Sequence, residues 1–530
     1  MKNKTIKSPI FLVLLINSTM LFSQTVGLLK NTSESNAGYT LLSKLGITYL
    51  IDNSGQIAHT WFNGTGTSHP GYLVENGDLF VVNRGIKRLN WEGDLIWQYS
   101  NIEAHHDVAI MPNGNVLLLI RGFKSNAEAI EAGRNPGLIN GDLEPMVIYE
   151  INSQGSIIWE WHVWDHLIQD FDSSKSNFGS VEDHPELVDI NFTRNFSVDW
   201  LHGNAINYNA ELDQILLSPR FNSEIWIIDH STSTAEAASH SGGNANKGGD
   251  LLYRWGNPIA YRAGTVNDQK LFGSHDAQWI APGLPGAGNI IIFNNGGTNY
   301  GRNGNYSSVD EITPPLNGFN YDKTNGQPYA PNSTTWTYTT DPLEDFYSSF
   351  ISGVQRLSNG NTFVDEGENG RLFEITTGGN VVWEYQNPIT SNAGILSQGD
   401  SPAAAPYAAL FRASRYTQEY ILNINKPLSN TLTIELYNTN STLTLQTNIS
   451  GPIITPAQGI YTYGNGQLIT LNALQSDSYQ FLDWTIISGT AIINNPNTSF
   501  TTAIINSDDA VIQANYLYDP DPLFSNGFEN

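Results

Sequence analysis

A short pattern recurs along most of this 530-residue chain: a tight turn, an apolar strand, a second strand and then an apolar residue followed by Trp. The clearest turns are Glu75-Asn76-Gly77-Asp78, Pro112-Asn113-Gly114-Asn115 and Ser358-Asn359-Gly360-Asn361, and their units end at Trp97, Trp159 and Trp383. Weaker copies end at Trp61, Trp255 and Trp336. Self-similarity of this kind is typical of repeat architectures, so we expect six units.

Each full unit supplies about four strands of alternating apolar character, and one such sheet cannot bury both of its faces. The units must therefore stack, and six stacked sheets predict a six-bladed β-propeller. The 48 Gly and the many Asn, Thr and Tyr residues also favour short strands and turns, so the fold class is predicted as all-β. The first unit lacks a strand, and we expect the late stretch 407–416 to complete it.

The domain prediction assigns residues 24–419 to the propeller and 420–530 to a small C-terminal β module, which is Thr/Asn-rich and lacks the apolar-Trp ending. The module weakly resembles small repeat modules appended to secreted bacterial proteins, which implies attachment or spacing. Long polar inserts interrupt the propeller, and such inserts are candidates for the rim of a pocket. They span residues 122–145, 162–198, 231–249 and 295–333.

Residues 1–23 are predicted to be a secretory signal peptide. Lys2, Lys4 and Lys7 precede the apolar run 10–16, and the Ser23-Gln24 junction follows. The alternative is a buried N-terminal strand. No later segment approaches twenty apolar residues, so we expect no membrane span in an exported protein, periplasmic or secreted.

Composition excludes some functions. The chain has no Cys, which rules out thiol catalysis and thiolate metal sites. Its formal net charge is −26 with only 25 Lys and Arg residues, which argues against nucleic acid as a partner.

The histidines hold equivalent places in the repeat. His69 lies nine residues before Asp78 and His106 nine before Asn115. Alignment of the apolar pattern puts His202 and His275 at the same position, and the sixth unit has Ser352 there. First strands of propeller blades line the central channel, so four histidines would meet near the axis. The alternative is a structural His copied with each repeat.

Arginines end the second strands of three units, at Arg84, Arg121 and Arg220. Such a residue is usually a solvated charge, but beside neutral histidines a guanidinium can hold a bound oxyanion. Asp107 and Asp276 directly follow His106 and His275. Adjacent strand residues point to opposite faces, so both are predicted to be structural.

Several phrases, in order, resemble the bacterial arylsulfotransferases over about residues 38–417: HHDVAIMPNGN, DWLHGNAINY, ILLSPR, SHDAQWIAPGLPGAGN, SGVQRLSNGNTFVDEG and GRLFEITTGGNVVWEY. The resemblance implies a six-bladed propeller, often periplasmic, that transfers a sulfuryl group from a phenyl sulfate donor to a phenolic acceptor without the nucleotide donor PAPS. It implies no metal and no organic cofactor.

The resemblance also implies residue roles. It makes His275 the nucleophile that becomes sulfurylated, with His202, Asn204 and Arg220 around the sulfate and His106 near the phenolic oxygen. His105 and His69 are expected to bind substrate beside them. Ser352 and Thr362 are the candidates for a family threonine near the sulfate.

Two other functions remain open at this stage: a metalloenzyme, because converging histidines also bind Zn²⁺ or Cu²⁺, and a noncatalytic propeller that binds glycans or proteins. The oligomeric state is left undetermined.

Overall fold

The computed structural model describes residues 25–518 apart from 65–68, 83–84, 101–102, 139, 194–197, 398–399, 403–405, 430–431, 466–467, 477, 494 and 506–508. The predicted signal peptide, residues 1–23, and Arg84 therefore lie outside the described residues.

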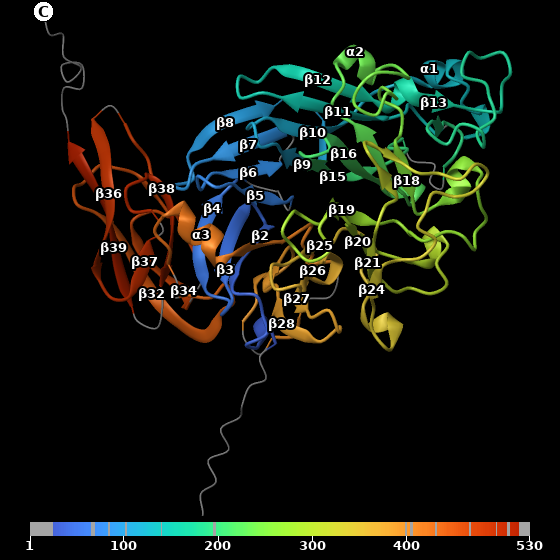
Figure 1. Cartoon of the computed structure of the whole chain (residues 1–530). Coiled ribbons are helices and arrows are strands. Elements are labelled where there is room, and N and C mark those ends of the chain that lie inside the picture. Colours follow the sequence, from blue (N-terminus) through green and yellow to red (C-terminus); the bar gives the residue numbers. More distant parts are fainter. Residues whose placement is uncertain are drawn as a thin grey trace, which may run out of the picture.

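The described chain is all-β, as predicted, and its first part forms six antiparallel sheets, numbered here 1 to 6 in chain order (Figure 1). Sheet 1 contains β31 (Ser414–Thr417), β2 (Gly38–Lys44), β3 (Ile47–Asp52) and β4 (Ile57–Phe62). Sheet 2 contains β5 (Gly71–Leu73), β6 (Leu79–Val82), β7 (Gly85–Leu89) and β8 (Leu95–Ser100). Sheet 3 contains β9 (Ala104–Ile110), β10 (Val116–Arg121), β11 (Met146–Ile151) and β12 (Ile157–His162).

The other three sheets repeat this order. Sheet 4 contains β15 (Gly203–Asn209), β16 (Gln214–Pro219), β17 (Ile225–Asp229) and β18 (Tyr253–Trp255). Sheet 5 contains β19 (His275–Trp279), β20 (Ile290–Asn294), β21 (Ser308–Ile312) and β24 (Trp336–Tyr338). Sheet 6 contains β25 (Gly353–Arg356), β26 (Thr362–Glu366), β27 (Arg371–Ile375), β28 (Val381–Gln386) and β1 (Gly27–Asn31).

The inserts carry short elements of their own. The helices are α1 (Asn126–Glu131) and α2 (Thr234–Ala237), each started by a Ser capping box. Three two-stranded ribbons pair β13 (Leu167–Ile168) with β14 (Val188–Asp189), β22 (Leu316–Asn317) with β23 (Asn320–Tyr321), and β29 (Ile389–Thr390) with β30 (Gly394–Ile395).

The Trp that ends each repeat lies on the fourth strand. Five of them donate an indole hydrogen bond to the next sheet or its connections: Trp61, Trp159, Trp255, Trp336 and Trp383. The indole N–H of Trp61 in sheet 1 donates at 3.2 Å to the carbonyl oxygen of Asn90, which directly follows strand β7 of sheet 2. Trp383 in sheet 6 donates to Asn53 O of sheet 1 at 2.9 Å. The same bond links Trp159 to Thr232, Trp255 to Pro331 and Trp336 to Thr377. A buried indole N–H needs such an acceptor, which explains why Trp recurs at this place.

Apolar clusters fill the space between consecutive sheets, and the one shared by sheets 6 and 1 includes Phe363 and Leu42. The other five lie between sheets 1 and 2, 2 and 3, 3 and 4, 4 and 5, and 5 and 6. Each sheet thus buries one face against the sheet before it and one against the sheet after it. The run of colours in Figure 1 shows that neighbouring sheets follow one another in chain order.

Two terminal segments join this arrangement. As predicted, a late strand, β31, pairs with β2, but it begins only at Ser414. The strand β1, which the sequence did not reveal, adds to the outer edge of sheet 6 by pairing with β28.

The domain boundary predicted at residue 420 falls too early. Helix α3 (Gln418–Ile424) spans it and buries Ile421 and Ile424 in the cluster between sheets 1 and 2. Leu432 and Ile434 are buried in the cluster between sheets 6 and 1. The C-terminal part with its own core therefore starts near β32.

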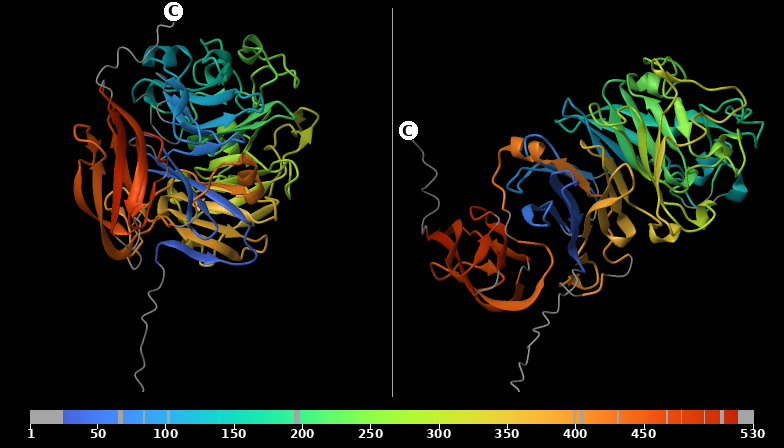
Figure 2. Two further views of the ribbon diagram at one scale, coloured as in Figure 1. Left: turned by 90° about the vertical axis from the view of Figure 1, so that its left-hand side faces the viewer. Right: turned by 60° about the horizontal axis from the view of Figure 1, so that its bottom comes forward.

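The C-terminal part consists of two sheets around one apolar cluster. Their strands are β32 (Tyr437–Thr447), β33 (Ile454–Thr455), β34 (Gly459–Asn465), β35 (Leu468–Ala473), β36 (Tyr479–Ser488), β37 (Ala491–Ile493), β38 (Phe500–Ile505) and β39 (Ala510–Tyr518). Both views of Figure 2 place them beside sheet 1, where Phe500 contacts Phe62. No helix in the described part of the chain has the length and hydropathy needed to cross a membrane.

Candidate active site

The predicted site histidines lie where the first strands of the sheets begin, and the backbone there is unusual. His106 and His202 have φ of 62° and 51°, in the left-handed region that non-glycine residues rarely adopt. The strand pairings β9–β10, β15–β16 and β19–β20 each have a register shift, a β-bulge, near the histidine at the start of the first strand. Bulges of this kind re-aim side chains beside active sites, and here they bring side chains from sheets 3, 4 and 5 together.

His202 and His106 are joined in a hydrogen-bonded chain. His202 Nδ1–H donates to Asp199 Oδ2 at 2.6 Å, which leaves Nε2 of a neutral His202 ring with a lone pair. His106 Nε2 lies 3.1 Å from that atom and therefore donates its proton to it. Nδ1 of His106 is then an unprotonated nitrogen, and it is buried without a partner in the described part of the chain.

His105 and His69 flank this chain. His105 stacks at 3.9 Å between ring centroids on His106, and its Nε2 lies 3.4 Å from Asp199 Oδ2. The His69 ring centroid is 6.1 Å from that of His106. The structure thus gathers four of the predicted histidines within one small volume.

His275, the first residue of β19, is fully enclosed and held in one tautomer. The amide nitrogen of Asn295 donates to two backbone carbonyls, Ser348 O at 2.9 Å and Ile351 O at 2.8 Å, so its oxygen must face the other way. That oxygen lies 2.6 Å from His275 Nδ1, which must carry the proton. Nε2 of His275 therefore has the lone pair.

Sheet 6 meets His275 through its backbone. The N–H of Ile351 donates to His275 Nε2 at 3.2 Å, from a residue with φ of 51° next to Ser352 with φ of 95°. Ser352 lies at this end, but its hydroxyl is engaged with Ser348 Oγ and Gly367 N. Thr362 pairs with Arg356 at the opposite end of β25–β26, so it is wrong as a candidate for a sulfate contact.

The histidines are held neutral by their surroundings. Burial lowers the pKa of His275 well below its ordinary value, and the positive charge of Arg220 lowers it further. Burial and the neighbouring histidines do the same for the pKa of His106. Burial lowers the pKa of His105 to about 3 and also lowers that of His69. At neutral pH these rings are therefore nucleophiles and bases.

Asp199 is the negatively charged end of the hydrogen-bonded series Asp199–His202–His106. Burial acts to raise its pKa, but the hydrogen bond from His202, together with the nearby His105 and Arg121, outweighs burial and gives a net lowering. The carboxylate is therefore ionised next to His202.

Arg220 is the cation of the site. It follows β16 directly, lies between the rings of Phe221 and Tyr300, and donates to Ser349 O at 3.3 Å. Within the described ranges it forms no salt bridge, and its buried Nε has no partner. Burial lowers its pKa, which nevertheless remains that of a cation. An unneutralised buried guanidinium in so acidic a chain favours an anionic ligand.

The equivalent Arg121 of sheet 3 differs, because Glu103 and Glu144 already pair with its guanidinium at 2.9 and 3.3 Å. Among the three arginines of the sequence prediction, Arg220 is the described one that forms no salt bridge with a described residue.

Asn204 and two phenylalanines complete the surroundings. Asn204 donates to Ser274 O at 2.9 Å, while its side-chain oxygen is buried without a partner among the described residues. Phe411 stacks on His106 at 5.1 Å between centroids, and Phe221 lies 5.0 Å from His202. Such rings suit an aromatic ligand.

A buried network of ion pairs lies next to the histidines and involves Asp107 and Asp276, which directly follow His106 and His275. Arg412, from the segment before β31, binds Asp107 of sheet 3 at 2.7 Å and Asp276 of sheet 5 at 3.0 Å. Tyr72 also donates to Asp107. The prediction that both aspartates are structural agrees with these contacts, since Asp199 and Asn295 are the residues that orient His202 and His275.

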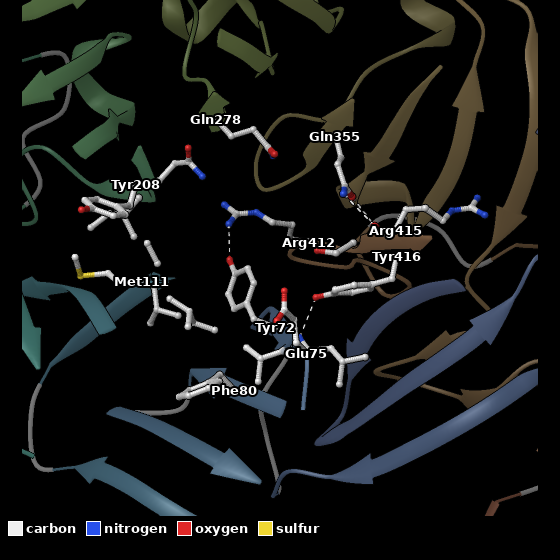
Figure 3. A pocket seen from close by; sticks show the side chains of 18 of the residues that line it. Tyr72, Glu75, Phe80, Met111, Tyr208, Gln278, Gln355, Arg412, Arg415 and Tyr416 are labelled. Carbon is white, nitrogen blue, oxygen red and sulfur yellow. Dashed lines mark hydrogen bonds between the residues drawn. The ribbon is translucent and has the colours of Figure 1, made fainter. Parts of the chain in front are cut away.

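A cavity of about 970 Å³ lies farther along the same inner strands, beyond Arg412 (Figure 3). Tyr72, Gln278 and Gln355 point into it. Because Arg412 and its two carboxylates are buried between this cavity and the histidines, the predicted site occupies one end of the central space.

His105, His106 and His202 could together hold a metal ion, because each offers one ring nitrogen and these three atoms lie within 4.8 Å of one another. The contacts do not require one, because each facing pair of atoms can be a proton donor and an acceptor in neutral rings.

Four residues of the site escaped sequence reasoning: Asp199, Asn295, Ile351 and Arg412. Asp199 stands three residues before His202 and could have been proposed from that spacing. Asn295 and Ile351 depend on loop conformation, which no local pattern reveals.

The fold and site define a repeat of antiparallel sheets with a buried cluster of histidines near an arginine that has no carboxylate partner among the described residues. A family model described as Arylsulfotransferase (ASST) matches residues 25–390. The chain therefore belongs to the arylsulfotransferase family, which supports aryl-sulfate sulfotransferase activity. No curated protein matches the chain significantly.

Solved structures are similar at low identity. A protein of unknown function from Bacteroides caccae is 12% identical, with a TM-score of 0.37, over 66% of this chain and 94% of that one. Virginiamycin B lyase from Staphylococcus aureus is 11% identical, with a TM-score of 0.31, over 69% and 89%. A putative 6-phosphogluconolactonase from Bacteroides fragilis is 10% identical, with a TM-score of 0.34, over 73% and 99%.

Proposed function

We propose that the six sheets form a closed six-bladed propeller and that this propeller transfers a sulfuryl group from a phenolic sulfate ester to a phenolic acceptor through sulfurylated His275. The indole bond from Trp383 to Asn53 and the apolar cluster shared by sheets 6 and 1 support the closure. The enclosed His275, with its lone pair on Nε2 and Arg220 beside it, carries the proposal for the reaction.

In the first half-reaction, His275 Nε2 attacks the sulfur of the aryl sulfate. The N–S bond forms as the S–O bond to the aryl group breaks, and the phenolate leaves with the electron pair of that bond. The Nδ1 proton stays on His275, so the modified ring is cationic and the attached sulfonate anionic. The Ile351 N–H must release Nε2 before attack.

The Arg220 guanidinium and the second N–H of the Asn204 amide would donate to the sulfuryl oxygens in this step, because charge on those oxygens and on the leaving phenolate increases toward the transition state. Two features support this role. Arg220 has no carboxylate partner within the described ranges, and it acts on His275 strongly enough to lower its pKa.

In the second half-reaction, His106 Nδ1 accepts the proton of the incoming phenol, and the phenolate oxygen attacks sulfur as the N–S bond breaks. His202 and the ionised Asp199 stabilise the protonated His106. His106 then passes this proton to the phenolate released in the first half-reaction, directly or through solvent, and returns to its neutral resting state. Protons and charges therefore balance over one cycle without a redox partner.

We further propose that the protein is exported to the periplasm or secreted, because of the basic and apolar order of residues 1–23. Sequencing of the mature N-terminus tests this, and an intact Met1 in protein from the native cells contradicts it.

The decisive experiment for the reaction is mass spectrometry of protein quenched during turnover of a chromogenic phenyl sulfate without acceptor. The expected result is a sulfuryl increment on the peptide that contains His275. His275→Ala should lose both the increment and transfer, while His162→Ala, a half-exposed histidine at the end of β12, should keep them. A sulfuryl increment elsewhere, or full activity in folded His275→Ala, would overturn the assignment.

A further inference from the structure

A second cluster of histidines lies on the outer side of the sheets, away from the inner strands. His166 ends the turn η2 (Val163–His166) after β12, and His240 and Asp250 belong to the insert between β17 and β18. Nδ1 of His166 and Nδ1 of His240 each lie 2.8 Å from the same oxygen, Oδ1 of Asp250. The three candidate ligand atoms lie within 4.8 Å of one another.

A neutral His166 ring cannot donate a proton to Asp250, although its Nδ1 lies 2.8 Å from Oδ1 of Asp250. Its Nε2 lies 2.8 Å from the carbonyl oxygen of Ala237, which only accepts, so Nε2 must carry a proton. Nδ1 of the neutral ring then points a lone pair at a carboxylate lone pair. The contact is attractive only when a positive charge lies between the two atoms: a second proton or a metal ion.

The active-site histidines make a useful contrast. His106 and His202 also meet through ring nitrogens, but one nitrogen donates and the other accepts without any cation. In the outer cluster, as at His230 between Asp213 and Glu150, a neutral tautomer leaves two acceptors face to face.

The two histidines of the cluster differ in exposure. His166 is fully buried, stacks on Trp161 at 5.7 Å between centroids and is fixed by Ala237 O. A backbone hydrogen bond to a ligating histidine is the usual support that orients such a ring. The His240 side chain is 63% exposed and lines a cavity of about 490 Å³, which gives an ion and a water ligand access.

The chain packs tightly around the buried side. Trp161 Nε1 donates to Gly249 O at 2.8 Å, next to Asp250. A Cβ at Gly249 would lie 2.0 Å from Ala237 O and 2.6 Å from His166 Nε2, so only glycine fits there. Asp250 and His166 are therefore held facing each other by their own backbones.

We propose that His166, His240 and Asp250 bind one divalent transition-metal ion of the zinc type, with water in the remaining position. Two imidazoles and one carboxylate are a donor set that such ions prefer, and three protein ligands leave an open site. Tetrahedral Zn²⁺ separates its ligand atoms by about 3.3 Å, so Asp250 or His240 must shift by roughly half an ångström.

The ion would fasten the insert 231–249 to the turn after β12. It is separate from the proposed sulfuryl transfer, since none of its ligands lies on an inner strand. The net charge of −26 raises the local concentration of cations around such a site.

The experiment is Zn²⁺ binding by the full-length chain, freed of metal with a chelator and then titrated with Zn²⁺ alone. Isothermal titration calorimetry gives the stoichiometry and affinity, and Co²⁺ absorption reports the ligand geometry. The variant His240→Ala removes the exposed ligand with little risk to folding, and Asp250→Asn is the second variant. His184→Ala is the matched control, because His184 lines the same cavity but is not a ligand.

We expect one equivalent of Zn²⁺ that His240→Ala and Asp250→Asn weaken at least tenfold and that His184→Ala retains, because even outer partners of a metal site contribute that much. The ion should also raise the unfolding temperature of the wild type and of His184→Ala, but not of His240→Ala. Identical Zn²⁺ binding by wild type and His240→Ala, or no binding at all, would show that a proton occupies the contact. Any binding by the axial histidines would persist in His240→Ala and is thereby distinguished.

Discussion

The side-chain oxygen of Asn295 lies 2.6 Å from Nδ1 of His275, while its amide nitrogen is committed to two backbone carbonyls. One amide thereby selects the tautomer of the proposed nucleophile. Asn295 is a positioning residue, since it acts on the reaction only through His275.

Replacing Asn295 with Ala should slow covalent labelling of His275 by about tenfold or more, the equivalent of one net hydrogen bond of about 1–1.5 kcal/mol. The ¹⁵N chemical shifts of the ring should also show loss of the Nδ1–H tautomer. Asn294→Ala is the matched control, because Asn294 faces Asp310. An unchanged tautomer in Asn295→Ala would contradict the proposal.

Arg220→Ala should slow labelling by about a hundredfold, because a lost oxyanion donor costs about 3 kcal/mol. The full extent of labelling should still be reached, since His275 remains. Arg220→Lys should recover only part of the rate, as ammonium lacks the bidentate fork. Arg121→Ala, at the equivalent strand end but paired with two glutamates, should change the rate only a few-fold in stopped-flow measurements. Equal effects of Arg121→Ala and Arg220→Ala would contradict a specific role for Arg220.

His230 should make stability depend on pH. It bridges Asp213 at 2.7 Å and Glu150, on the neighbouring sheet 3, at 3.2 Å. Burial acts to lower its pKa, but the two hydrogen bonds outweigh burial and raise the pKa to about 9. Because this value is above that of the unfolded chain, about 6.5, the stabilisation is complete below pH 6.5 and is lost as pH rises through 9.

His230→Gln should therefore be less stable than wild type by up to about 3 kcal/mol at pH 6, and the difference should vanish above pH 9. Thermal unfolding at both pH values measures it. His162 and its partner Glu160 are both half-exposed, so His162→Gln should show little effect at either pH. A difference in stability that is larger at pH 9.5 would have the wrong sign for this bridge.

Truncation tests the corrected domain boundary. A chain that ends after residue 436 keeps α3, Leu432 and Ile434, and it should remain folded and active. A chain that ends after residue 419 loses the buried Ile421 and Ile424, worth roughly 2 kcal/mol each, a large part of a typical stability. Size-exclusion chromatography and thermal unfolding distinguish them, and equal stability of the two chains would restore the earlier boundary.

The repeat allowed much of the fold to be predicted, because the Trp endings and Asn-Gly turns are local signals with a fixed spacing. The late strand followed from a missing partner in the first unit. Strand β1 could not be predicted in the same way, since residues 27–31 carry no repeat signal and pair with β28 more than 350 residues later.

The candidate site was predictable only where it follows the repeat. The histidines share one repeat position, so their convergence could be inferred. Asn295, Asp199 and the Ile351 N–H contribute through loop backbone and left-handed φ values, which depend on packing among three sheets. The same backbone explains why Thr362, a plausible residue type, lies at the wrong end of its strand.

Arg412 is synthesised after the two aspartates that it pairs with, and this order affects when the protein can become active. Asp107 and Asp276 leave the ribosome long before Arg412, which follows Asp107 by 305 residues. Until then, two carboxylates that must be buried together lack their counter-charge, and such burial is strongly unfavourable. A nascent or prematurely terminated chain can assemble the histidine-bearing strands but not the ion network next to them. Catalytic competence should thus appear only once Arg412 and the strand β31 that follows it have been made, so incomplete products are expected to be inactive rather than partly active.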